Sequence, residues 1–87
     1  MIEAQSIDEA LLFATFPVQV VMLDNFTVPG LRRAVRLIRK VNPGMPLEAS
    51  GGVTLKTIRA IARTGVDRVS VGALTHSAPA ADLSLEL

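Results

Sequence analysis

Three positions that each follow a short apolar run stand at a constant interval in this chain. Asp24, Glu48 and Gly72 are spaced 24 residues apart, and apolar residues recur at helical spacing between the runs. Strands that alternate with helices form a parallel sheet with right-handed crossovers. This pattern fits a (β/α) barrel or an open α/β sheet. Because a whole barrel takes about 250 residues, the 87 residues present would supply about half of one.

The local patterns give the expected elements. Ser6 and Glu9 have the S-x-x-E form of a helix capping box. Thr54 is a favourable N-cap for a third helix, and Gly65 is its expected C-terminal cap. The predicted strands cover residues 1–5, 18–23, 46–49, 68–71 and, as an edge strand, 82–87. The predicted helices cover about 7–15, 29–41 and 55–64, the last with Leu55, Ile58, Ile61 and Ala62 on its apolar side.

The composition indicates an aliphatic interior, because 49% of the residues are hydrophobic and all three aromatic residues are Phe. The chain contains no Cys, which excludes a disulfide scaffold and a thiolate metal site. No apolar run approaches the roughly 18 residues of a membrane span, and no signal-peptide pattern opens the chain. We therefore expect a soluble, cytoplasmic protein with no membrane partner.

The basic residues are concentrated in two predicted helices. Eight of the nine Lys and Arg residues lie in the segments 32–40 and 56–63, although the formal net charge is only +1. They could form a polyanion-binding face or the solvated sides of two amphipathic helices. No aromatic residues interleave with them, which favours the solvated sides and a protein without a nucleic-acid partner.

The carboxyl ends of the predicted strands are where chemistry gathers in a parallel α/β sheet. Glu3, Asp24, Glu48 and Gly72 would share that rim. Asp24 ends a buried apolar strand, so it is either a ligand for Mg²⁺ or sugar hydroxyls, or a residue that forms an Asx turn or caps the following helix. His76, the only His, lies beyond Gly72 and could donate a hydrogen bond to a phosphate or lie in a surface loop.

The loop Ser50-Gly51-Gly52 leads from a strand toward the helix capped by Thr54. Glycine lets backbone N–H groups approach an anion closely, and a helix N-terminus adds a partial positive charge. The alternative is a tight βα turn that needs positive φ. A second glycine, Gly72, follows the next strand in the same way, and two adjacent glycine-bearing loops favour a phosphate site.

The sequence resembles quinolinate phosphoribosyltransferase in its C-terminal part. The segments that carry the resemblance are MLDNF (22–26), LEASGGVT (47–54), TGVDRVSVGALTHSAPA (64–80) and the ending DLSLEL. Together they cover essentially the whole chain in order. The resemblance implies half of a (β/α) barrel that takes part in NAD biosynthesis. The family transfers phosphoribose from phosphoribosyl pyrophosphate to quinolinate with Mg²⁺, giving nicotinate mononucleotide, pyrophosphate and CO₂.

The resemblance also implies residue roles. Glu3 and Asp24 match the residues beside the ribose and the metal, and Glu48 matches the acid next to the phosphate loop. The positions that match contacts to the 5′-phosphate or adjoin them are Ser50, Gly51, Gly52, Gly72 and His76.

The chain departs from the family in extent, since the family's enzymes are about three times longer. Their N-terminal domain and earlier strands carry the groups that hold the quinolinate carboxylates and pyrophosphate. We therefore expect residues 1–87 to be a single C-terminal half-barrel segment that is inactive alone. We also expect it to self-associate or to bind the missing half. Two alternatives stay open: a phosphate-binding or self-assembling module without catalysis, and a phosphoribosyltransferase with another acceptor.

Overall fold

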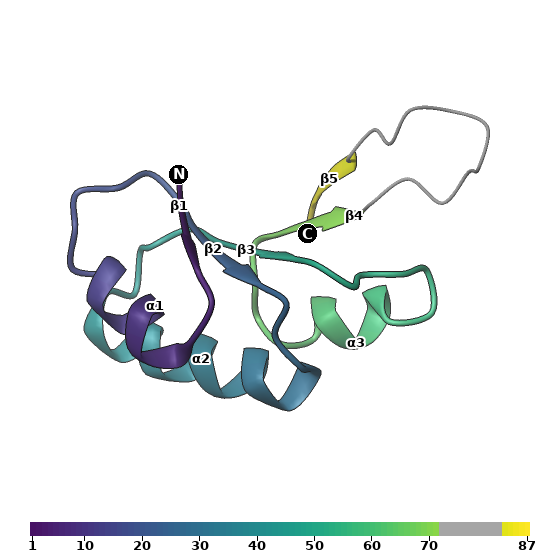
Figure 1. Ribbon diagram of the computed structural model, residues 1–87, viewed down its shortest axis with the longest axis horizontal. Coiled ribbons are helices and arrows are strands. Elements are labelled where there is room, and N and C mark those ends of the chain that lie inside the picture. The colour runs from purple at the N-terminus through teal and green to yellow at the C-terminus, as the bar shows by residue number, and fades with distance from the viewer. Residues whose placement is uncertain (72–82) are drawn as a thin grey trace.

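The computed structural model describes residues 1–71 and 83–87 as strands and helices in alternation, followed by a last strand (Figure 1). Along the chain the elements are β1 (Ile2–Ala4), α1 (Ile7–Phe13), β2 (Val21–Asp24), α2 (Val28–Val41), β3 (Leu47–Ser50), α3 (Ile58–Ala62), β4 (Arg68–Val71) and β5 (Leu83–Glu86). The predicted α/β class is confirmed.

The five strands form one sheet in the order β1-β2-β3-β4-β5. The first four strands pair in parallel, as the alternation predicted. All three helices lie on the same side of this sheet, as Figure 1 shows. Each crossover therefore joins neighbouring strands over a single face, which leaves the other face without a helix among the described elements.

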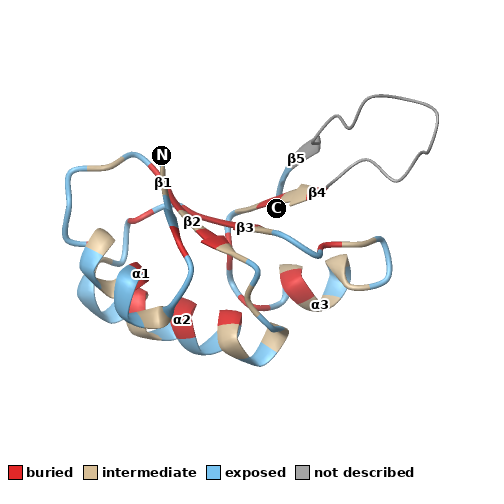
Figure 2. Cartoon of the chain, in the orientation of Figure 1, coloured by how far each residue is buried: buried red, intermediate tan, exposed pale blue. Residues whose placement is uncertain are grey.

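The pairing register sorts side chains onto the two faces, because successive residues of a strand point in opposite directions. One row runs through Ala4, Leu23, Ala49 and Val69, and these side chains are buried beneath the helices (Figure 2). Their helical partners come mainly from α2, whose predicted apolar stripe is confirmed: its buried residues are Leu31, Ala34, Val35 and Ile38.

The helices cover only one face of the sheet, and the opposite face carries mainly polar side chains. The neighbouring row of the register runs through Glu3, Met22, Glu48 and Arg68. Asp24 and Ser50 pair with each other two residues further along their strands, on the same face. The sequence alternation therefore places the candidate site on the face that the helices leave open.

The helix termini follow the capping rules in two cases. The Ser6 hydroxyl accepts a hydrogen bond from the Glu9 backbone N–H at the start of α1, and the Glu9 carboxylate accepts one from the Gln5 N–H. The Ser6 contact confirms the N-cap half of the predicted capping box, while the Glu9 carboxylate bonds the N–H of the residue before the N-cap rather than that of Ser6. Thr27 caps α2 by accepting from the Gly30 N–H. None of the helices in the part of the chain that the structure describes is long and apolar enough to cross a bilayer.

Two predicted elements begin three residues later in the structure than the sequence indicated. β2 begins at Val21 rather than at residue 18, because Val18 donates its N–H to Phe16 in a tight turn. α3 begins at Ile58 rather than at residue 55, and Leu55 is 74% exposed. Thr54 accepts a hydrogen bond from the Thr57 N–H, so a side-chain-stabilised turn replaces the first turn of the helix.

The last strand, which the sequence predicted as an edge strand without a direction, departs from the parallel pairing of the other four. β5 pairs antiparallel with β4, from Arg68 opposite Glu86 to Val71 opposite Leu83. A parallel partner would need a crossover connection of a dozen or more residues, and only 11 residues (72–82) separate β4 from β5 in the sequence. The mostly parallel sheet thus ends in one antiparallel strand.

Candidate functional site

The loops after β2 and β3 are joined at the carboxyl ends of their strands. Asp24 and Ser50 are register partners. The Ser50 hydroxyl donates a hydrogen bond to Asp24 Oδ1 over 3.2 Å. The Asn25 backbone N–H donates to the Ser50 carbonyl over 2.8 Å. These two contacts fix the Asp24 carboxylate beside the glycine loop, so the structure brings together two of the residue groups that the sequence predicted for one site.

Gly51 is required by this junction. Its φ is +79°, and a Cβ built on it would lie 2.8 Å from Asp24 Oδ1 and 2.9 Å from the Asn25 nitrogen. Gly52 follows with φ +66°, but a Cβ built on it would lie 3.9 Å from Asn25 Oδ1 and would clash with nothing. The structure therefore confirms the tight βα turn at positive φ. The phosphate cradle stays a prediction that this turn geometry allows.

Asn25 is a residue of this site that the sequence analysis missed. It is the only residue other than glycine with positive φ in the described ranges 1–71 and 83–87, with φ 60°. Asparagine adopts the left-handed region more readily than most residues. This conformation turns the chain out of β2 and points its N–H at Ser50. The sequence feature that could have indicated this turn is the Asp24-Asn25 pair at the end of an apolar strand. The sequence analysis used the pair to end the strand and gave Asn25 no role of its own.

Glu48 is buried, with only 3% of its surface exposed. Arg68 Nε lies 3.8 Å from Glu48 Oε1, and the two residues are register partners on β3 and β4. A buried carboxylate is stabilised by such a cation. Glu48 is therefore a buried, paired carboxylate rather than a solvated strand-end residue. Arg68 was also missed, although it is the one basic residue outside the two helical segments.

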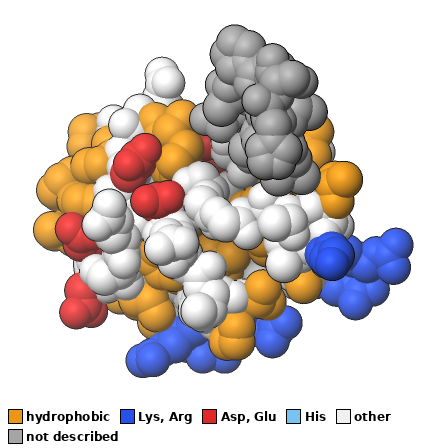
Figure 3. All heavy atoms as spheres, turned by 45° about the vertical axis from the view of Figure 1, so that its right-hand side comes forward, with side chains coloured by type: hydrophobic (Ala, Val, Ile, Leu, Met, Phe, Trp, Pro, Cys, Tyr) orange, Lys and Arg blue, Asp and Glu red, His pale blue; other side chains and the backbone are white. Residues whose placement is uncertain are grey.

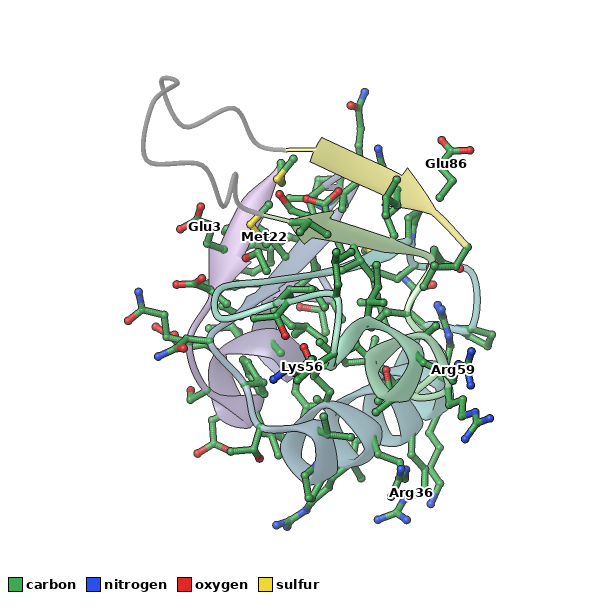
Figure 4. All side chains as sticks on the ribbon, turned by 90° about the vertical axis from the view of Figure 1, so that its right-hand side faces the viewer. Glu3, Met22, Arg36, Lys56, Arg59 and Glu86 are labelled. Atoms are coloured by element: carbon green, nitrogen blue, oxygen red, sulfur yellow. The ribbon has the colours of Figure 1, made fainter. Side chains whose placement is uncertain are left out.

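Glu3 lies on the same face but at a different level from Asp24. It pairs with Met22, and Met22 pairs with Glu48, whereas Asp24 lies two residues beyond Met22. Figure 4 shows Glu3 and Met22 together on the sheet side of the molecule, while Arg36 and Arg59 project from the helical side. Arg36 and Arg59 are exposed, as the solvated sides of two amphipathic helices would place them.

The acidic residues do not form a ready-made metal cage. Among residues 1–71 and 83–87, no three His, Cys, Asp or Glu side chains are grouped closely enough to hold a metal ion. The predicted site residues Gly72 and His76 lie outside the described residues. The described part of the site therefore consists of the Asp24–Ser50 junction, the Gly51–Gly52 turn and the buried Glu48–Arg68 pair, with Glu3 at its border.

These features define a class of protein: an α/β chain of βα repeats with polar and glycine residues where neighbouring strands end, which is where ligands bind in such sheets. Comparison with known proteins narrows the class. The chain belongs to the quinolinate phosphoribosyltransferase family, since residues 1–86 match the family described as quinolinate phosphoribosyl transferase, C-terminal domain. The resemblance found in the motifs is confirmed.

Individual relatives are similar across most of this chain. A nicotinate-nucleotide pyrophosphorylase (carboxylating) of Rattus norvegicus is 41% identical over 99% of the chain, and the one of Homo sapiens is 36% identical over 99%. A quinolinate phosphoribosyltransferase (decarboxylating) 2b, mitochondrial, of Nicotiana tabacum is 46% identical over 77% of the chain. The chain spans 29% of the rat and human proteins and 21% of the tobacco protein.

Proposed function

We propose that this chain supplies the phosphate and ribose side of a phosphoribosyltransferase site. The observation that carries the proposal is the junction of Asp24, Ser50 and Gly51 at neighbouring strand ends. It sets a carboxylate, a hydroxyl and a loop of unhindered backbone within one small region. A carboxylate can hold ribose hydroxyls, and glycine N–H groups can hold a 5′-phosphate.

The barrel part of the proposal is supported by the strand order. Sequential parallel neighbours with every helix on one face curve in one direction, and such a sheet becomes the wall of a (β/α) barrel. The polar row of Glu3, Glu48 and Arg68 would then face the barrel interior. In this proposal residues 1–87 are a single C-terminal half-barrel segment, and the other strands come from a missing half.

The proposed reaction is transfer of phosphoribose from phosphoribosyl pyrophosphate to quinolinate, with release of pyrophosphate and CO₂ and formation of nicotinate mononucleotide. The ribose gains positive charge as the pyrophosphate leaves. Asp24 and Glu3 are negative groups on the same face and would stabilise that charge. Glu48, held by Arg68, would border the phosphate loop from inside the sheet.

Mg²⁺ fits this set of donors. Magnesium is usually held by one or two carboxylates together with substrate phosphates and water, rather than by a cage of protein ligands. Asp24 and Glu3 are the carboxylates that would hold it, and Asp24 forms no ion pair within the described residues. When bound, the ion would neutralise charge on the departing pyrophosphate.

Turnover would need groups that the described residues do not offer. The exposed arginines Arg36 and Arg59 lie on the helical side (Figure 4). No second basic residue joins Arg68 on the described polar face of the strands. We therefore propose that the chain alone is inactive, and that it works in the cytoplasm as part of a larger assembly or homo-oligomer. A phosphate-binding or self-assembling module without catalysis is the second candidate, favoured by the unpaired outer edge of β1 in the described sheet.

Titration of the ¹⁵N-labelled chain with inorganic phosphate, followed by NMR, tests the proposed site. We expect the amide signals of residues 50–53 to shift in a saturable way. Ser50→Ala should weaken the response, whereas Thr15→Ala, which removes a hydroxyl bonded to its own helix end, should leave it unchanged. If the chain is folded and phosphate does not shift the amide signals of residues 50–53, the proposal is wrong.

A further inference from the structure

The proposed phosphate loop borders a face of the sheet that is rich in acids. Glu3 and Glu48 lie in one row of the pairing register, and Asp24 lies two residues beyond that row on β2. Glu86 of β5 extends the row, since it pairs with Arg68. These four carboxylates share the face with a single basic residue of the described strands, Arg68. A face with this excess of negative charge repels a phosphate unless the charge is offset.

The basic residues of the helices lie on the other side of the molecule. In Figure 3 Lys and Arg gather along the bottom and one flank, apart from the acidic side chains. Figure 4 shows Arg36 and Arg59 on the helical side and Glu3 on the sheet side. Exposed charges on opposite sides of a protein are largely screened from each other, because the Debye length is about 10 Å at about 0.1 M salt. Within the described residues, the positive charge available to the loop therefore comes from Arg68 and from backbone N–H groups.

Glu48 is the acid that precedes the loop in its own strand. It lies two residues before Ser50 on the same face, which is a separation of about 7 Å along a strand. Only 3% of its surface is exposed, so water and salt screen its charge little. Asp24 and Glu3 are the carboxylates proposed to hold Mg²⁺, and this leaves the charge of Glu48 to be offset by the protein itself.

Arg68 is the cation that lies beside Glu48. Its Nε is 3.8 Å from Glu48 Oε1, and the register holds the two residues side by side on β3 and β4. The Arg68 side chain is 32% exposed, whereas that of Glu48 is 4% exposed. The guanidinium thus covers the carboxylate from the open face, where a ligand would approach. An opposite charge at this distance offsets much of the field of a buried carboxylate.

We propose that Arg68 is a positioning residue of the phosphate site, which neutralises Glu48 and thereby sets the affinity of the loop at Ser50 and Gly51 for a phosphate group. Arg68 acts through Glu48 rather than on the ligand. The inference rests on the proposed function, and it assigns a role to a residue that the strand-end pattern did not include. Loss of Arg68 alone leaves an uncompensated buried charge below the phosphate. Loss of both charges removes the repulsion together with its remedy.

A double-mutant cycle tests this role, with inorganic phosphate as the probe and the amide signals of residues 50–53 as the readout, at about pH 8, where phosphate and carboxylates are ionised. Arg68→Leu should raise the Kd about tenfold, and Glu48→Gln should lower it about threefold or more. The double variant Glu48→Gln/Arg68→Leu should recover most of the affinity that Arg68→Leu loses. Arg68→Lys keeps the charge and should stay within about threefold of the wild type.

Arg36→Leu is the matched control, because it removes the same charge from the helical side and should leave the Kd unchanged. Urea denaturation measures the stability of each variant separately, since an ion pair that only supports the fold would change stability and not the Kd of the folded chain. If Arg68→Leu does not fold, Glu48→Gln decides: tighter binding follows only if the Glu48 charge opposes phosphate.

The outcomes separate this inference from the proposed function. A folded wild-type chain in which phosphate shifts no loop amide overturns the phosphate site, and the role of Arg68 with it. Saturable binding by the wild type with an unchanged Kd in Arg68→Leu overturns the role of Arg68 alone. The same holds if Glu48→Gln binds phosphate no more tightly than the wild type, or if the double variant recovers no affinity.

Discussion

Arg39, in the last turn of α2, forms an ion pair with Asp67, the residue before β4, across 3.0 Å. The same Asp67 oxygen accepts the Leu47 backbone N–H over 2.8 Å. Arg39 also donates to the carbonyl oxygens of Met45 and Gly65. One side chain thus joins α2 to the starts of β3 and β4, at the N-terminal ends of these strands. The glycine loop lies at the opposite, C-terminal end of β3. The pair supports the fold and takes no part in the candidate site.

Asp67→Ala should lower the free energy of unfolding by about 1–2 kcal/mol, since it removes a charged acceptor that is itself half exposed and leaves the Leu47 N–H without its side-chain partner. Urea denaturation measures the loss. Lys40→Ala is the matched control on the same helix, where removal of an exposed basic side chain should change stability by less than about 0.5 kcal/mol. Equal effects of the two substitutions would show that the Arg39–Asp67 junction contributes nothing specific.

The glycine loop allows a comparison of two glycines in one chain. Gly51→Ala would force a Cβ to within 2.8 Å of Asp24 Oδ1 at φ +79°, whereas a Cβ at Gly44 would meet nothing within 4 Å. We expect Gly51→Ala to cost about 1–3 kcal/mol of unfolding free energy, and Gly44→Ala to be close to neutral. Thermal or urea denaturation of both variants checks this. A Gly51→Ala chain as stable as Gly44→Ala would mean that the loops are not interlocked as described.

The helices and parallel strands could be predicted because their signals are local and periodic. α2 buries Leu31, Ala34, Val35 and Ile38, which recur at helical spacing, whereas β2 alternates buried and half-buried residues. The predicted start of α3 was wrong because the Thr57 N–H donates to the Thr54 hydroxyl, which stabilises a turn in place of the first turn of the helix. Hydrophobic periodicity carries no information about such a side-chain hydrogen bond. The direction of β5 was not predicted, because an alternating strand can pair either way.

The sequence predicted which residues form the candidate site but not how they are arranged. Strand-end reasoning found Asp24 and the glycines, but only the pairing register shows that Asp24 meets Ser50. Glu48 lies two residues before Ser50, beside Arg68. A register depends on how whole strands align, and no single residue encodes it. Asn25 was missed because its role rests on a backbone angle.

Asn25 provides a test of that angle. At φ 60° glycine is tolerated and a β-branched residue is not. Asn25→Gly should change the unfolding free energy little, whereas Asn25→Val should lower it by about 1–3 kcal/mol. The two variants are compared by urea denaturation and by the NMR signal of the Ser50 amide. If Asn25→Val is as stable as Asn25→Gly, the turn after β2 does not need the left-handed conformation.

The last prediction concerns turnover. The purified 87-residue chain should release no CO₂ from labelled quinolinate in the presence of phosphoribosyl pyrophosphate and Mg²⁺. Fixed charges that stabilise a transition state contribute factors of about 10²–10³ each. The described polar face offers one basic residue, Arg68, and it is already paired with Glu48. Addition of the missing half, supplied as a separate polypeptide, should restore the reaction, and Asp24→Asn should abolish the restored activity.

Thr15→Ala serves as the control for that experiment, because within the described residues the Thr15 hydroxyl bonds only the Leu12 carbonyl at the end of α1, on the helical side of the sheet and not at the Asp24–Ser50 junction. It should leave the restored rate unchanged. Release of CO₂ by the chain alone, free of host enzyme, would contradict the prediction and show that the residues present suffice. Loss of that release on Asp24→Asn would then assign the activity to the strand-end junction, since Asp24 is the carboxylate that Ser50 holds beside the glycine loop.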